Sequence, residues 1–369
     1  MSRKNEAIWI EKSKRWQIKV QKDGVRRAFY SPDPRKKGKA EAERKADRWL
    51  ETGSRKEAAR IGALAKEFAE YESAMYGTGN NRQHESIYRN WIAPKYEHKK
   101  AADMTQQDWK NIIKDAYTAG RSKKTLKNIR GYITSFCGYM EDCDVPIKYP
   151  RKLRIPDDAP EHEKNILQPS QLRTLFTEDT VTTRGKAGPC FHIYAFRFLA
   201  VSGYRPGEMC GLRKTDLKKT YLKFTNSINI YGELTAGKNE RARRKLPRTT
   251  YINTLIKQQM ENLKAHGLED CQWLFPDADG EPLNPKKLYK RWKKYADQHG
   301  LTCSPYELRH TFISVSKSAV PAELLKLVVG HSESMDTFGV YGHEVDGELK
   351  QAGKLIEGVF DGILKNEVG

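Results

Sequence analysis

The sequence predicts a multidomain protein that is mainly α-helical and carries small β-sheets. Its 369 residues are long for one compact domain and suggest two or three. Near the N-terminus, apolar and polar residues alternate as in strands, whereas most of the chain beyond residue 60 has helical periodicity. A proline-containing stretch without periodicity interrupts this pattern near residue 150. We therefore divide the chain into segments 1–60, 61–150, 151–165 and 166–369.

Segment 1–60 is predicted to form a β-hairpin or a three-stranded sheet that packs on one helix. Trp16, Ile18 and Val20 alternate with polar residues, which is the period of a strand with one buried face. Asp23 and Gly24 provide a turn before a further strand at 28–30. The stretch KAEAERKADRWLE then contains strong helix formers. A module this small needs the helix to cover its sheet.

Segment 61–150 is predicted to be helical. Thr105 and Asp108 resemble a capping box, with Asp in place of Glu, at the start of QQDWKNIIKDAYTAG. The next helix, in SKKTLKNIRGYITSFCGYM, has an apolar stripe with basic residues beside it. That basic face is either solvated or in contact with a phosphate backbone. Its members are Lys123, Lys124, Lys127 and Arg130.

Segment 151–165 is predicted to be a linker, because prolines and mixed charges replace the helical pattern. Segment 166–369 alternates helices with short strands and is long enough to bury a sizeable core. It therefore reads as a mixed α/β domain.

The charge of the chain favours a polyanionic partner. Lys and Arg number 67 against 47 Asp and Glu, a formal net charge of +20. Residues 1–60 hold 19 basic and 9 acidic residues, a net of +10. We expect nucleic acid rather than a membrane surface, because there is no long apolar run, signal peptide or lipidation motif. In segment 1–60 the candidate DNA contacts are Lys19, Arg26 and Arg27.

The six cysteines have no CxxC spacing and no neighbouring histidine pair, so we interpret them as reduced thiols of a cytoplasmic protein. With nucleic acid as the expected partner, we expect the protein to be nucleoid-associated. We expect no metal site and no cofactor.

Four stretches of segment 166–369 contain residues suited to chemistry on an anion. Arg205 in SGYRPGE precedes a helix start, although it could equally be a surface residue paired with Glu208. YGELTAGKNERARRKLPR looks like a β-hairpin with Lys238 near its tip. SPYELRHTF holds Arg309, and VVGHSESMDTFGVYGH holds His331 and Tyr341. Taken singly, each signal is weak, since solvated lysines and structural histidines are common.

In this order, the five stretches SGYRPGE, TAGK, YELRHTF, VVGH and VYGH resemble the active-site series of the tyrosine recombinases, the integrases of phages and conjugative transposons. The resemblance implies that Tyr341 attacks the scissile phosphate and forms a 3′-phosphotyrosine. Arg205 and Arg309 would clamp the non-bridging oxygens, and His331 would donate a hydrogen bond to the same phosphate. Lys238 would protonate the departing 5′ oxygen. No metal or cofactor is needed for such reversible covalent chemistry.

One position departs from the family pattern. The family usually has histidine three residues before the second arginine, and this chain has Tyr306 there. A phenol is a weaker general base than imidazole at neutral pH, so we expect Tyr306 to hydrogen-bond the phosphate. His310 lies about 100° around the helix from its neighbour Arg309 and is expected to be structural. Glu208 is expected to support the Arg205 turn, and His343 has no assigned role.

The resemblance also implies the arrangement of the whole chain. Segment 1–60 would be an arm-type DNA-binding domain, 61–150 a helical core-binding domain, and 166–369 the catalytic domain. Its C-terminal tail would be a docking tail that packs on a neighbouring protomer, with packing of its apolar face in cis as the alternative. Partners would be duplex attachment sites and three further copies in a homo-tetramer, with an accessory excision factor or host architectural protein besides. The alternatives are a type IB topoisomerase-like enzyme and a catalytically silent sequence-specific DNA-binding protein.

Overall fold

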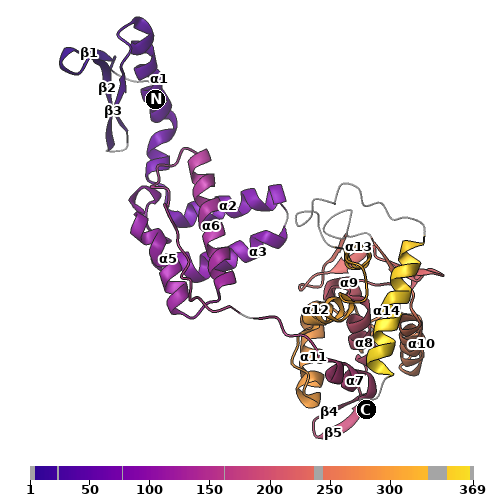
Figure 1. Cartoon of the computed structure of the whole chain (residues 1–369). Helices are drawn as coiled ribbons and strands as arrows, with labels where there is room; N and C mark the ends of the chain where they lie inside the picture. Colours follow the sequence, from indigo (N-terminus) through magenta and orange to yellow (C-terminus); the bar gives the residue numbers. More distant parts are fainter. Residues whose placement is uncertain are drawn as a thin grey trace. The chain divides into compact units, whose positions relative to one another are not determined.

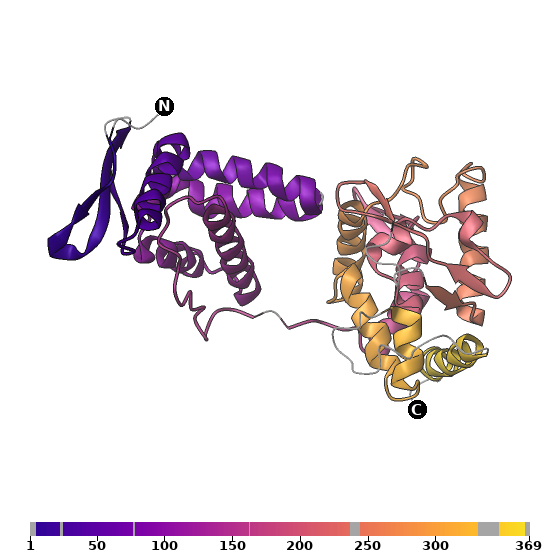
Figure 2. The same cartoon turned by 90° about the horizontal axis from the view of Figure 1, so that it is seen from above.

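The computed structural model describes residues 5–22, 25–76, 78–161, 163–236, 244–330 and 347–365. They form two compact units, Met1–His162 and Glu163–Gly369 (Figures 1 and 2). The boundary falls inside the predicted linker. Among the described helices, none combines the length and the apolarity needed to cross a membrane.

The first unit begins with the predicted three-stranded sheet. Strands β1 (Ile8–Ile10), β2 (Arg15–Lys22) and β3 (Val25–Ser31) are antiparallel, with β2 in the centre. Helix α1 (Lys36–Glu57) lies along one face of the sheet (Figure 1). Ile18 and Val20 are buried against this helix in a small cluster of their own. The alternation in the sequence therefore predicted the buried face correctly.

The register of β2 and β3 separates the three basic residues predicted to contact DNA. Lys19 lies opposite Ala28, and Gln21 lies opposite Arg26, so Lys19 and Arg26 share the face that α1 does not cover. Arg27 lies opposite the buried Val20 and therefore belongs to the other face. Because successive side chains of a strand point to opposite faces of the sheet, the neighbouring Arg26 and Arg27 lie on opposite sides.

A helical cluster follows in the same unit and has its own hydrophobic core. The predicted capping box is present, because Thr105 Oγ1 accepts from Asp108 N–H while the Asp108 carboxylate accepts from Thr105 N–H. One π-helical turn, Tyr88–Ile92, joins the third and fourth helices. The helices are α2 (Ile61–Tyr76), α3 (Thr78–Ile87), α4 (Ala93–Tyr96), α5 (Gln106–Thr118) and α6 (Lys123–Asp142).

Most of the proline-containing stretch lies against the first unit. Leu153, Ile155 and Ala159 pack on its helical core, and Tyr117 Oη donates to Asp158 at 2.6 Å. The stretch after His162 belongs to the second unit, where the backbone N–H of Asn165 donates to Glu307 at 3.0 Å.

The second unit is a helical bundle with three two-stranded sheets around one core. The hydrophobic α8 is buried almost all round and contacts α10 and α12. The helices are α7 (Pro169–Thr177), α8 (Ile193–Ser202), α9 (Pro206–Cys210), α10 (Thr250–Ala265), α11 (Pro285–His299), α12 (Pro305–Ser316), α13 (Ala322–Val329) and α14 (Glu348–Leu364). The strands are β4 (Thr180–Thr183), β5 (Lys186–Pro189), β6 (Tyr221–Lys223), β7 (Asn226–Ile228), β8 (Leu234–Ala236) and β9 (Lys245–Pro247).

The strand pairing corrects the predicted hairpin around Gly237 and Lys238. The strands on either side of residues 237–243 are not partners, because β8 pairs with β7 and β9 pairs with β6. The turn between β7 and β8 is at 229–233, where the Asn229 side chain accepts from two backbone N–H groups. Gly237 and Lys238 were predicted to lie at the tip of a hairpin. The hairpin that forms is the one between β7 and β8, and its turn contains Tyr231 and Gly232.

The C-terminal helix α14 packs in cis. Ala352, Ile356 and Phe360 are buried in the core of its own unit, and Tyr251 Oη donates to Asp361 at 2.8 Å. The tail was expected to dock on a neighbouring protomer, and in this structure α14 takes the alternative, cis arrangement, because its apolar face fills the core of its own unit.

Candidate active site

Arg205 is placed by a sharp turn between two helices. Helix α8 ends at Gly203, whose φ is 65°, and a Cβ there would lie 2.6 Å from Phe312 Cδ1. Only glycine therefore fits this turn. Arg205 is the N-cap of α9, with Pro206 in the first turn, and its backbone N–H donates to Glu208 Oε2 at 2.9 Å. The sequence RPGE thus fixes the start of α9 and the backbone position of Arg205.

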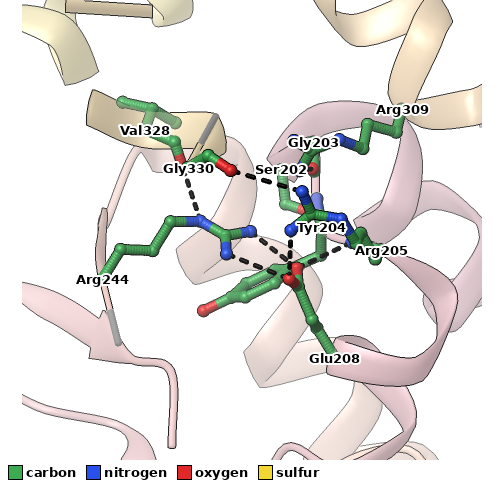
Figure 3. A network of polar contacts seen from close by, with 9 residues as sticks. All are labelled: Ser202, Gly203, Tyr204, Arg205, Glu208, Arg244, Arg309, Val328 and Gly330. Carbon is green, nitrogen blue, oxygen red and sulfur yellow. Dashed lines mark hydrogen bonds and ion pairs between the residues drawn. The ribbon is translucent and has the colours of Figure 1, made fainter. Parts of the chain in front are cut away.

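The predicted Arg205–Glu208 pair exists, but it is not a surface pair. Arg205 Nη1 donates to Glu208 Oε1 at 2.7 Å, and Arg205 Nη2 donates to the Gly330 carbonyl at 3.3 Å. The Glu208 residue is only 3% exposed, whereas the Arg205 side chain is 37% exposed. The carboxylate is therefore the buried anchor, and the guanidinium still reaches solvent. Figure 3 shows the contact between the two side chains.

Arg309 comes to the same place from α12. It is 2% exposed, and its Nη1 donates to the Gly203 carbonyl at 2.7 Å. Its Nη2 is buried and has no hydrogen-bond partner among the described residues. A buried donor without a partner costs about 1–3 kcal/mol, so this nitrogen is suited to an incoming acceptor. The sequence prediction that Arg205 and Arg309 converge agrees with their positions in Figure 3.

Arg244 is a third arginine of the site, and sequence reasoning missed it. Its Nη2 and Nη1 donate to Glu208 at 2.6 Å and 3.1 Å, and its Nε donates to the Val328 carbonyl at 2.8 Å. In the sequence it lies in the basic run RARRK, where a solvated side chain is the ordinary expectation. One signal could have indicated that Arg244 is buried. It directly precedes strand β9 and lies two residues before Leu246, which is buried.

The charges of this cluster do not balance. Three guanidinium groups face one carboxylate, which leaves a formal charge of +2 among these four residues. Burial raises the pKa of Glu208, but hydrogen bonds from Arg244 and the charges of Arg244 and Arg205 outweigh burial and lower it. Glu208 is therefore ionised at neutral pH.

The excess charge is concentrated on Arg309. Burial, reinforced by the charges of Arg205 and Arg244, lowers the pKa of Arg309 from 12.5 to about 10. The guanidinium remains protonated at neutral pH, but its charge is poorly compensated. Arg205 and Arg309 together thus carry donors and positive charge of the kind that suits an anion with two oxygens side by side.

Tyr306 and His310 lie one helical turn apart on α12. Tyr306 is 49% exposed, and its ring meets the His310 ring edge to face, with centroids 5.6 Å apart. Burial, together with the charges of Lys164 and Arg309, lowers the pKa of His310. Its imidazole is therefore neutral at neutral pH, and its Nε2 is buried with no partner among the described residues. Of the two side chains, Tyr306 is the more exposed.

The remaining predicted catalytic residues, Lys238, His331 and Tyr341, lie outside the described residues, as does His343. Two described elements mark where these stretches attach. Gly330, at the end of α13, directly precedes His331, and Arg244 directly follows residues 237–243.

The four basic residues predicted on α6 do not behave alike. Lys123 pairs with Glu161 at 2.7 Å and so helps to hold the proline-containing stretch. Lys124, Lys127 and Arg130 are exposed. A further basic face, on α11, was not predicted. It combines the half-exposed Tyr289 with the exposed residues Lys286, Lys290 and Lys293.

Comparisons with known proteins agree with this site. Residues 165–348 match the phage integrase family. A XerC-like tyrosine recombinase of Caldanaerobacter subterraneus is 23% identical over 66% of this chain and 68% of its own. The tyrosine recombinase XerA of Thermococcus onnurineus is 24% identical over 68% of this chain and 81% of its own.

The fold is also that of solved integrases. A structure of the Tn1549 transposon integrase with transposon right end DNA superimposes with a TM-score of 0.62, at 19% identity, over 80% of this chain and 99% of that one. A lambda integrase tetramer bound to a Holliday junction gives a TM-score of 0.59, at 11% identity, over 92% and 98%. The chain belongs to the tyrosine recombinases. It is accordingly a tyrosine-type site-specific DNA recombinase.

Proposed function

We propose that this protein is the integrase of a mobile element, which cuts and rejoins two duplexes through transient 3′-phosphotyrosines. The observation that carries the proposal is the arginine cluster around the buried Glu208, where Arg309 Nη2 has no partner among the described residues and positive charge is in excess. A phosphodiester gathers negative charge on its non-bridging oxygens during transfer, and preorganised guanidinium groups stabilise that charge.

The covalent steps are assigned to residues located by sequence. The Tyr341 hydroxyl loses its proton to solvent, and its oxygen forms a bond to phosphorus while the bond from phosphorus to the 5′ oxygen breaks. Lys238 gives a proton to that leaving oxygen, and His331 donates a hydrogen bond to the phosphate. The phosphotyrosine conserves the energy of the broken ester, so a 5′-hydroxyl of a second duplex can reverse the step.

The uncovered face of the N-terminal sheet supports the proposed arm-site binding. Strands β1, β2 and β3 contain no Asp or Glu, and Lys19 and Arg26 are exposed on this face. Arg15 lies over the Tyr30 ring on the same face, with its guanidinium carbon 4.0 Å from the ring centroid. A two- or three-stranded sheet with basic side chains can enter a DNA groove.

We expect the double variant Lys19→Gln/Arg26→Gln to weaken binding to the distal arm sites and to reduce its salt dependence. The plot of log K against log salt concentration has a negative slope, and the loss of two phosphate contacts should make this slope less steep by about 1.8. Titrations of labelled arm-site duplex at four salt concentrations measure the slope. Arg27→Gln, on the opposite face, is the matched control and should leave the slope unchanged. An equal loss in the control would show that overall charge, and not this face, determines binding.

The exposed basic residues of α6 and α11 support contact with the core site. Lys124, Lys127 and Arg130 lie on the first unit, and Lys286, Lys290 and Lys293 lie on the second. Both sets stand on helices whose opposite faces are buried, so the lysines are held on rigid elements. We propose that each set contacts the phosphate backbone of the core duplex.

The partners proposed for this chain are duplex attachment sites and further copies of itself. The lambda integrase structures contain a dimer on a core site and a tetramer on a Holliday junction. A homo-tetramer on two synapsed duplexes fits strand exchange by this chain. An accessory excision factor or host architectural protein would act on the arm sites.

The test is to trap the covalent intermediate. A duplex with the core site of the element's junction, nicked near the cleavage position, loses a short fragment after cleavage and so prevents religation. We expect an adduct that survives boiling in detergent and forms on this duplex but not on a scrambled one. No adduct on the cognate duplex would favour a silent DNA-binding protein. Relaxation of supercoiled plasmid without the site would favour a type IB topoisomerase-like enzyme.

Tyr306→Phe is expected to slow cleavage of the same nicked duplex by about tenfold, because it removes one hydrogen bond to the charged phosphate. Such a bond contributes about 1.5–3 kcal/mol, and water competes for it because Tyr306 is half-exposed. Tyr306→His should cleave at least as fast as the wild type. Single-turnover rates at saturating protein measure both. A phenylalanine variant with the wild-type rate would remove Tyr306 from the catalytic set.

A further inference from the structure

Arg244 connects three elements at the centre of the catalytic unit. Its side chain is 5% exposed, and its guanidinium carbon lies 5.1 Å from the Tyr204 ring centroid and 5.3 Å from that of Phe224. It donates two hydrogen bonds to Glu208 of α9 and one to the Val328 carbonyl of α13. Figure 3 shows the guanidinium beside the Tyr204 ring, with its hydrogen bonds directed to Glu208 and Val328.

Glu208 is shared unequally between its two arginines. Arg244 contacts both carboxylate oxygens, at 3.1 Å and 2.6 Å, whereas the side chain of Arg205 contacts only Oε1, at 2.7 Å. Arg205 therefore uses Nη1 on the carboxylate and retains donors and net charge for a ligand. Without Arg244, the buried carboxylate would have Arg205 as its only cationic partner among the described residues. A buried carboxylate with one cation binds it bidentately where the geometry allows.

Arg244 also lies against Gly330. That residue has a φ of 66° and ends α13, and a Cβ on it would lie 2.9 Å from Arg244 Cδ. The carbonyl of Gly330 accepts from Arg205, and the next residue in the sequence is His331. Arg244 thus contacts both the carboxylate that orients Arg205 and the end of the helix that leads to His331.

We propose that Arg244 is a positioning residue for strand cleavage. It neutralises Glu208, so that the guanidinium of Arg205 stays available for the scissile phosphate. Arg244 itself does not touch the phosphate. The inference rests on the proposed function, because it assumes that the cluster binds the phosphate during transfer.

A double-mutant cycle on the nicked core duplex tests this role. The variants are Arg244→Met, Glu208→Gln and the two combined, and the readouts are the single-turnover rate of adduct formation and the dissociation constant for the duplex. We expect Arg244→Met to slow cleavage about 100-fold, the size of effect found when one preorganised donor of a charged transition state is lost. Duplex affinity should change by less than about threefold, because many other basic residues hold the backbone. In the Glu208→Gln background, where no buried carboxylate competes for Arg205, the same substitution should cost less than about tenfold.

The outcomes separate the inference from its premise. If the wild type forms no adduct, the proposed function fails. If the wild type does and Arg244→Met costs the same factor in both backgrounds, Arg244 only supports the fold and the inference fails. If Arg244→Met does not fold, the cleavage rates of Glu208→Gln and of the combined variant still test the inference. Both of these variants lack the buried carboxylate that would be uncompensated without Arg244. A 100-fold gap between those two would overturn the inference. Arg244→Lys, which keeps the charge, should recover most of the cleavage lost in Arg244→Met.

Discussion

Tyr341→Phe is expected to abolish the covalent adduct while leaving duplex binding within about twofold of the wild type. The substitution removes only the phenolic oxygen, so no nucleophile remains at this position to form a bond with phosphorus. Denaturing gels of the nicked core duplex measure the adduct, and the titration of the same duplex at matched salt measures affinity.

The position of the adduct can be mapped without mutation. Trypsin cuts after Lys326 and Lys350, and the peptide between them, 327–350, contains Tyr341 as its single tyrosine. Mass spectrometry of the nuclease-trimmed adduct should therefore place one nucleotide remnant on that peptide. Tyr306→Phe is the matched control, since it removes a phenol from the site but should still form the adduct. A remnant on another peptide, or an adduct that persists in Tyr341→Phe, would refute the assignment of the nucleophile.

Arg309→Met is expected to make the protein more stable and to slow cleavage by about 10²- to 10³-fold. The loss of rate follows from the missing donors to the phosphate. The gain in stability follows from the pKa of Arg309, which burial and two neighbouring arginines lower to about 10. A base whose folded pKa lies below its unfolded pKa destabilises the fold wherever it is protonated. After subtraction of the lost bond to the Gly203 carbonyl, we expect a net gain of about 1 kcal/mol in the free energy of unfolding.

The sign of this effect and its pH range are both testable by urea unfolding. Below pH 10, Arg309 is protonated in the folded and unfolded states, so the gain should be equal at pH 6 and pH 8. It should shrink only above about pH 10. The control is Arg197→Met, at another buried arginine that donates to the Leu175 and Glu178 carbonyls outside the cluster. That variant should lose stability and keep its cleavage rate. Loss of stability in Arg309→Met would contradict the proposed charge imbalance.

Much of the fold was predictable from local patterns. The alternation around Trp16 to Val20 gave the buried face of the first sheet, and Thr105 with Asp108 gave a helix start. The hairpin predicted around Lys238 was wrong, because β8 pairs with β7 across a turn at 229–233 and β9 pairs with β6. Strand pairing depends on contacts that one strand alone does not specify.

The site was predictable to the extent that its residues stand in recognisable stretches. Arg205 and Arg309 were found by the order of their motifs, and both reach the cluster around Glu208. Arg244 was missed because a basic run usually marks solvated side chains. Arg244 is buried because it contacts Tyr204, Phe224 and Glu208, and these residues lie elsewhere in the sequence.

The sequence by itself indicated the reaction class, because five short motifs in a fixed order resemble the active-site series of the tyrosine recombinases and the positive charge suits DNA. Only the tertiary structure decided how the arginines share one carboxylate. Hydrogen bonding and desolvation depend on distances of a few ångströms between segments more than 100 residues apart, such as Gly203 and Arg309. The same reasoning applies to Arg26 and Arg27, which are neighbours in the sequence and lie on opposite faces because a strand alternates.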